Sequence, residues 1–506
     1  MTGEPTQVGG QRPVPLRSYG HPMLGAEPYG GEPVYIPRTR VSGAAASSQT
    51  PQRGAVPTRI SRTRIAVIGL LALALMACGV VGSVATLNHL GQTWLGPGGS
   101  PAATAVAPPV NPDSSVVTAA AAAALLSARS RAVLAHDEPG FLAGVDPTDE
   151  QFVARQRQLF TSLESLPLGY ARWTVRPNSS YNRPTLATQY GAPIFVTDAE
   201  FDYQLKGYDS TPVANAETLT FVRRAGRWEL GGDSDLDNLL PEGGHAEPWD
   251  VGPIEVVRGT SSLVIGAPED HDALPELARV ADQAAAAVSF RWSKGWSHKV
   301  VVYAPRDARV ISTYFRSDLQ SVDSASAVQI EVFNAVPEWD DRAESAGSRV
   351  IFNPTYTQPG DPELPVLLRH EFTHVATRSA TSEATPTWLI EGFAEYTAYL
   401  GEPGDRGVAQ EVFDAAAAGQ LMPYLPSSID FYSDGDNYDR SWLLCLYIGQ
   451  KYGAAKVSAL YEFPARAGGT DPGEAARLAI HSVLGITQEQ LIKNVNDWAR
   501  TAVPAM

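Results

Sequence analysis

The stretch LLRHEFTHV, residues 367–375, carries the spacing His-Glu-x-x-His. His370 and His374 are four residues apart, so a helix would project both imidazoles from one face, about one turn apart. Two imidazoles in that arrangement bind one Zn²⁺ at about 2.0–2.1 Å each. Glu371 is offset around the helix, where its carboxylate reaches a water near the ion without ligating the ion itself. This stretch therefore predicts a zinc-binding helix, and its apolar residues predict that the helix is buried.

A second segment, TWLIEGFAEY (residues 387–396), supplies two carboxylates. A catalytic zinc site needs a third protein ligand and an open fourth position. Glu391 is placed to be that ligand from a second helix packed against the first. Glu395 points the same way, and we expect it to accept a hydrogen bond from the N–H of a ligand imidazole.

The two segments together resemble the gluzincins, the thermolysin-like and aminopeptidase-like zinc metallopeptidases of the MA clan. The resemblance covers about residues 348–460 and is strongest over 366–400. It implies a peptide or protein substrate, with Glu371 as the general base. The zinc ligands that it implies are His370, His374 and Glu391.

The same resemblance implies that the strand before the zinc helix, here SRVIFNPT (348–355), pairs with an extended substrate. A GxMEN-type exopeptidase signature does not precede the zinc helix, which favours an endopeptidase or an undefined specificity over an aminopeptidase.

Gluzincins also use a later Tyr or His to stabilise the oxyanion, and two residues are candidates here. Tyr438 opens the predicted helix NYDRSWLLCLYIGQKYG, and a phenol there could donate to the oxyanion. The alternative for Tyr438 is packing on Trp442, one turn on. His481 lies in the apolar helical stretch ARLAIHSVLG and is more typical of a core histidine. Cys445 lies among leucines and is predicted to be a buried thiol.

The charge of the chain excludes one class of function and predicts an anchor. With 39 basic and 55 acidic residues the net charge is −16, whereas nucleic-acid binding needs a basic face. Residues 65–87 read IAVIGLLALALMACGVVGSVATL, which is long enough to cross a membrane as one helix. Arginines precede this segment closely, so the positive-inside rule places the N-terminus in the cytoplasm. The alternatives are a signal peptide and a lipoprotein signal ending at Cys78.

The rest of the chain divides by composition and periodicity. Residues 1–64 are Pro- and Gly-rich and predicted to be a disordered cytoplasmic tail, and residues 88–112 read as a linker. Residues 113–245 predict helices followed by antiparallel strands, a small α+β domain that resembles the NTF2-like or cystatin-like superfamily, particularly at FVRRAGRWEL. We expect this domain to serve as a docking or spacer domain. Residues 246–506 predict a second α+β domain, a mixed sheet followed by helices, as in a gluzincin catalytic domain.

Two functions are consistent with these patterns. The first is a single-pass membrane-anchored zinc metallopeptidase that hydrolyses peptide bonds outside the cytoplasm. The alternative is a non-catalytic membrane-anchored interaction protein, in which the NTF2-like domain binds a partner and the metallopeptidase fold is a scaffold.

Overall fold

The computed structural model describes residues 112–237, 246–310, 326–355, 357–400 and 422–502. The fold is α+β, as the sequence predicts. The predicted tail and membrane helix (1–64 and 65–87), and nearly all of the linker, lie outside the described residues. Within the described ranges, no helix has both the length and the apolar character needed to cross a membrane.

The first domain consists of helices followed by a four-stranded antiparallel sheet in the order β1-β2-β3-β4. A two-residue turn of Ala225 and Gly226 joins β3 to β4, and both residues have positive φ, as tight hairpin turns require. The elements are α2 (Pro112–Leu134), α3 (Glu138–Leu142), α4 (Glu150–Ser165), β1 (Leu168–Val175), α5 (Pro184–Tyr190), β2 (Ile194–Leu205), β3 (Val213–Arg224) and β4 (Arg227–Gly232).

The second domain begins with a five-stranded sheet in the order β5-β6-β7-β9-β8. The strands β6, β7 and β9 are parallel, whereas β5 and β8 are antiparallel to their neighbours and form the two edges. The elements are α6 (Pro248–Val251), β5 (Glu255–Arg258), β6 (Ser262–Gly266), η3 (Pro268–Asp270), α7 (Leu274–Arg291), β7 (Val300–Ala304), β8 (Ala327–Phe333) and β9 (Ser345–Phe352).

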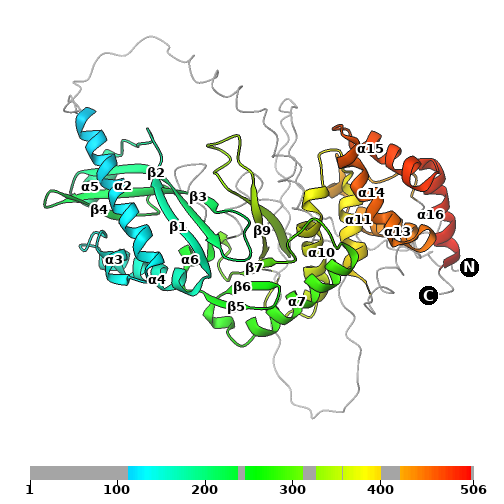
Figure 1. Ribbon diagram of the computed structural model, residues 1–506, viewed down its shortest axis with the longest axis horizontal. Helices are drawn as coiled ribbons and strands as arrows, with labels where there is room; N and C mark the ends of the chain where they lie inside the picture. The colour runs from blue at the N-terminus through cyan, green and yellow to red at the C-terminus, as the bar shows by residue number, and fades with distance from the viewer. Residues whose placement is uncertain (1–111, 238–245, 311–325, 356, 401–421, 503–506) are drawn as a thin grey trace, which may run out of the picture.

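Helices follow this sheet along the chain. They are α10 (Leu364–Thr377), η4 (Arg378–Ala380), α11 (Thr387–Ala398), η5 (Phe431–Ser433), α13 (Asp436–Tyr452), α14 (Ala454–Ala467), α15 (Pro472–Ala479), η6 (Ile480–Leu484) and α16 (Gln488–Ala502). In Figure 1 the first domain lies at one end of the molecule, the five-stranded sheet in the middle and the last helices at the other end.

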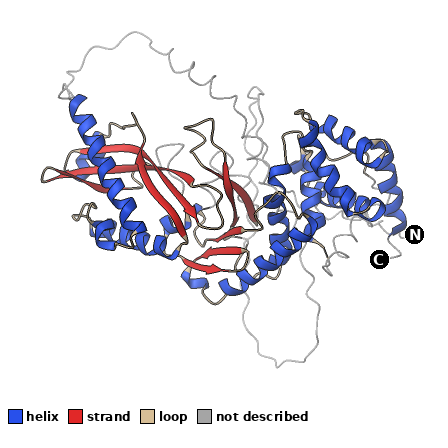
Figure 2. Cartoon of the chain, viewed as in Figure 1, coloured by secondary structure: helices blue, strands red, loops and turns tan. Residues whose placement is uncertain are grey.

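The strands β6 and β7 are buried on both faces, which explains why their sequences, SLVIG and VVVYA, read as apolar runs. Val300 and Val302 pack into a core with α7 and α10, while Val301 and Tyr303 pack into a core with the first domain. The ring of Trp249 lies between the two sheets, 5.2 Å from the ring of Tyr203 and 6.2 Å from that of Tyr303. The first domain therefore covers one face of this sheet (Figure 2). Its role as a docking or spacer domain stays a prediction.

A buried ion pair also joins the two domains. Arg349 on β9 donates from both terminal nitrogens to Asp209, in the turn after β2, at 2.7 and 3.1 Å. Neither side chain has exposed surface. The hydroxyls of Tyr303 and Tyr203 accept further hydrogen bonds from Arg349 at 3.1 and 3.3 Å. The guanidinium thus has partners from both domains.

The strand expected to pair with substrate lies in the wrong position for that role. Residues 348–355 fall largely within β9, which has β7 on one side and β8 on the other. Since its hydrogen-bonding groups face neighbouring strands, β9 offers no open edge there. Among the described strands, β8 is the one at this edge of the sheet, so β9 itself cannot take an added strand there.

Candidate metal centre

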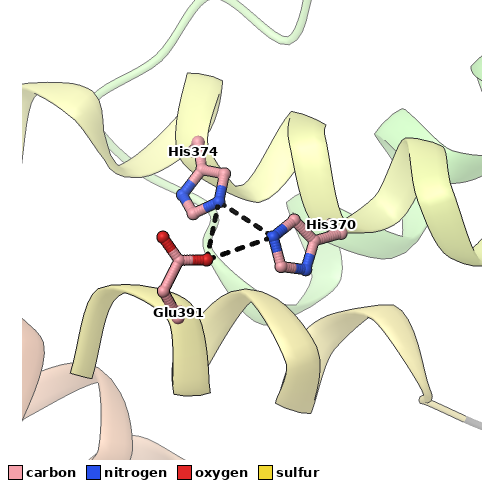
Figure 3. Close-up of side chains that lie close together, drawn as sticks. All are labelled: His370, His374 and Glu391. Atoms are coloured by element: carbon pink, nitrogen blue, oxygen red, sulfur yellow. Dashed lines mark hydrogen bonds and ion pairs between the residues drawn. The ribbon is translucent and has the colours of Figure 1, made fainter. Parts of the chain in front are cut away.

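The helices α10 and α11 bring three of the predicted residues together in the interior (Figure 3). The Nε2 atoms of His370 and His374 are 3.1 Å apart. Oε2 of Glu391 lies 3.4 Å from Nε2 of His370 and 3.6 Å from Nε2 of His374. All three side chains are at most 1% exposed. The structure thus places the three predicted ligands in one cluster that could hold a metal ion.

The distances within this cluster fit a metal ion. Four ligands at about 2.0–2.1 Å in a tetrahedron are about 3.3 Å from one another, close to the separations of the three atoms here. Oε2 of Glu391 has no hydrogen-bond partner among the described residues, although it is buried. Its nearest contacts are the two imidazoles at 3.4 and 3.6 Å, and a cation between the three atoms would stabilise this buried oxygen further.

Glu395 lies behind His370, as the sequence predicts. Its Oε1 is 3.1 Å from Nδ1 of His370. A carboxylate at Nδ1 holds the proton on that nitrogen and leaves the lone pair of Nε2 directed at the cluster. The side chain of Glu395 is therefore placed to favour the tautomer that a metal ligand needs.

The pKa values of the buried groups depend on one another, because three carboxylates lie around two imidazoles. Burial lowers the pKa of His370, but Glu391 and Glu395 outweigh it and raise that pKa to about 10. Burial also lowers the pKa of His374, and here the lowering prevails. Burial raises the pKa of Glu391, but its contacts with both histidines outweigh that effect and lower it. The carboxylates of Glu391 and Glu395 thus favour positive charge at this place, and a bound cation would replace the proton on His370.

The side chain of Glu371 extends from α10 toward strand β8. The backbone N–H of Gln329 on β8 donates to its carboxylate, and burial raises the pKa of Glu371 to about 8. Its Oε1 has no partner among the described residues. The carboxylate is thus fixed beside the cluster without being part of it, as the sequence predicts.

Gly392 explains why α11 can lie so close to the next helix. A Cβ at this position would lie 2.5 Å from the carbonyl oxygen of Ser441 on α13, closer than such atoms approach. Only glycine permits this contact. The contact fixes the position of α11 against α13, and with it the position of Glu391.

The other predicted residues have mixed outcomes. Tyr438 lies in the first turn of α13 and is buried, with its ring 5.2 Å from that of Phe431. Its role at an oxyanion stays a prediction, and the ring of Trp442 packs against Tyr399. The prediction of a buried His481 is wrong: the side chain is exposed on η6, because the neighbouring Ile480 takes the buried position. Cys445 is a buried free thiol, as predicted.

One hydrogen bond of the site was not predicted from the sequence. Tyr432, on the short turn η5, donates from its hydroxyl to Oε1 of Glu391 at 3.1 Å. Burial and the carboxylate of Glu391 raise the pKa of Tyr432, so the phenol keeps its proton and remains a donor. No spacing relates Tyr432 to the zinc motif, because a tertiary contact between a loop and α11 brings it there.

No family model matches this chain, and no curated protein matches it.

Proposed function

We propose that the chain is a membrane-anchored zinc-dependent peptidase of the gluzincin type. The observation that carries the proposal is the convergence of His370, His374 and Glu391, with three lone-pair atoms 3.1–3.6 Å apart. Two imidazoles and one carboxylate are a usual protein ligand set for catalytic zinc. The metal when bound supplies a Lewis acid that polarises a carbonyl oxygen and acidifies water.

Glu371 is the proposed general base. Its carboxylate takes a proton from the attacking water and passes it to the leaving amine. Burial, which raises the pKa of this carboxyl to about 8, makes it a stronger base than an exposed glutamate. The hydrogen bond from the backbone of Gln329 orients the carboxylate for both transfers.

The edge strand β8 supports a peptide as the substrate. The carbonyl of Ser326 accepts from the backbone N–H of Asn353, so the even-numbered residues of this segment face β9. The odd-numbered residues Ala327, Gln329 and Glu331 then turn their backbone groups to the outer edge of β8. The N–H of Gln329 already donates to Glu371, so a peptide would pair with the remaining groups of this edge. An extended peptide added along β8 would place a scissile bond near the proposed base.

We further propose that the first domain is NTF2-like and that the catalytic part lies outside the cytoplasm. Helices packed with a four-stranded antiparallel sheet support the first point. The second rests on the predicted anchor over 65–87. The alternative of a non-catalytic scaffold is less favoured, because a scaffold would have no need of a buried carboxylate such as Glu371 beside the cluster.

The test compares three forms of the full chain, solubilised in detergent and loaded with zinc. Glu371→Gln should keep one zinc per chain, by elemental mass spectrometry, and lose nearly all cleavage of a peptide library. Glu489→Gln, a change at an exposed site on α16, should keep both. Full cleavage by Glu371→Gln would refute the mechanism, and absence of zinc from the unaltered chain would refute the metal site.

A further inference from the structure

The two carboxylate oxygens of Glu391 have different surroundings. Oε2 faces the imidazoles of His370 and His374 at 3.4 and 3.6 Å. Oε1 instead accepts the hydrogen bond from the hydroxyl of Tyr432 at 3.1 Å. A carboxylate binds a metal through one oxygen or through both, and the phenol engages one of the two.

Tyr432 is held in place by the helix that packs on α11. The preceding residue, Phe431, is fully buried, and its ring lies 5.2 Å from that of Tyr438 in the first turn of α13. The side-chain amide of Asn437, in the same turn of α13, donates to the carbonyl of Phe431 at 2.8 Å. The turn η5 is thereby attached to the N-terminus of α13.

The helix α13 is in turn fixed against α11 through the close contact at Gly392, the residue after Glu391. The phenol and the carboxylate therefore come from elements whose separation is set by backbone packing. A hydrogen bond between groups fixed in this way loses little side-chain entropy when it forms.

We propose that Tyr432 is a positioning residue of the metal site, whose phenol holds Glu391 so that only Oε2 is offered to a divalent metal ion. The inference rests on the proposed function for the existence of that site. Groups that hydrogen-bond to metal ligands fix the ligand's rotamer before the ion arrives, and their loss weakens metal binding. Tyr432 does for Glu391 what Glu395 does for His370.

The experiment measures the zinc affinity of the full chain by competition with a fluorescent chelator. Tyr432→Phe removes the donor and keeps the ring, and we expect its Kd for Zn²⁺ to rise about 10- to 100-fold. Tyr424→Phe is the matched control, because the side chain of Tyr424 is 68% exposed, and its Kd should not change. Circular dichroism verifies that each variant is folded.

The absorption spectrum of the Co²⁺-loaded chain is the second readout. In Tyr432→Phe both oxygens of Glu391 become free to bind the ion. The second oxygen raises the coordination number of Co²⁺, so we expect the visible absorption bands to be weaker. Equal zinc affinity and an equal cobalt spectrum for Tyr432→Phe and the unaltered chain would overturn the inference, even if the variant melted at a lower temperature. Equal zinc affinity for the unaltered chain and His374→Ala would instead overturn the proposed metal site, and the role of Tyr432 with it.

Discussion

Replacing Asp209 by Asn should destabilise the whole protein, although Asp209 belongs to the first domain. The substitution keeps the size of the side chain and removes its charge. Arg349 would then be a guanidinium with no exposed surface and no carboxylate partner. Burial alone lowers the pKa of Arg349, and Asp209 outweighs that effect and keeps the pKa well above its ordinary value. The substitution thus leaves a charge in the interior with only neutral partners.

The expected loss of stability is about 3–5 kcal/mol, the usual cost of removing one partner from a buried pair. Unfolding entropy near the midpoint is about 2.1 cal/mol/K per residue, or about 0.8 kcal/mol/K for the roughly 390 residues from α2 to α16. The melting temperature of Asp209→Asn should therefore fall by about 4–6 °C. Arg349→Met should have a similar effect, and the double variant should lose less than the sum, because neither charge is left alone.

Scanning calorimetry of the full chain measures these differences. The matched control is Asp340→Asn, which breaks an Arg–Asp pair of similar geometry whose Arg342 side chain is 85% exposed. That change should leave the melting temperature where it is, since exposed pairs contribute little. A melting temperature of Asp209→Asn within about 1 °C of the unaltered chain would show that the pair does not join the domains energetically.

Three further outcomes follow from the site. Gly392→Ala should lower the free energy of unfolding by about 1–3 kcal/mol, because the new Cβ clashes with the backbone of Ser441. Gly360→Ala should not lower it, because a Cβ there has no neighbour within 4 Å, and equal denaturation midpoints for the two variants would contradict this prediction. Zinc must displace the proton that His370 holds up to about pH 10, so the Kd should rise about tenfold for each unit that the pH falls below about 10. Chelator competition measures this, and a flat profile would be inconsistent with it. Zinc at about 100 times its Kd should raise the free energy of unfolding by about 2.7 kcal/mol, seen as a higher melting temperature. EDTA should abolish this effect and His374→Ala should lack it. A melting temperature that does not respond to EDTA would argue against the site.

The cluster could be predicted because its residues follow helical spacing. His370 and His374 are one turn apart on any helix, and Glu391 lies on the adjacent predicted helix, so two local patterns suffice to place three side chains. Glu395 follows from the same reasoning, one turn beyond Glu391.

Features that depend on tertiary contacts were missed or placed wrongly. Tyr432 reaches Glu391 from a turn whose place is set by α13, and no periodicity encodes that contact. Residues 348–355 were expected to pair with substrate, because sequence order does not reveal that β9 lies between β7 and β8. His481 lies in an apolar stretch, but a stretch with helical period also contains exposed positions.

The sheet with two apolar faces has a consequence for where this chain can be cut. A fragment beginning at residue 246 would carry the whole zinc motif, yet would expose Val301, Tyr303 and their neighbours to water. Such a truncated form should collect in inclusion bodies unless residues 112–237 are supplied in trans. A chimaera that joins residues 246–506 to an unrelated first domain would meet the same obstacle, because the new domain would have to cover that face.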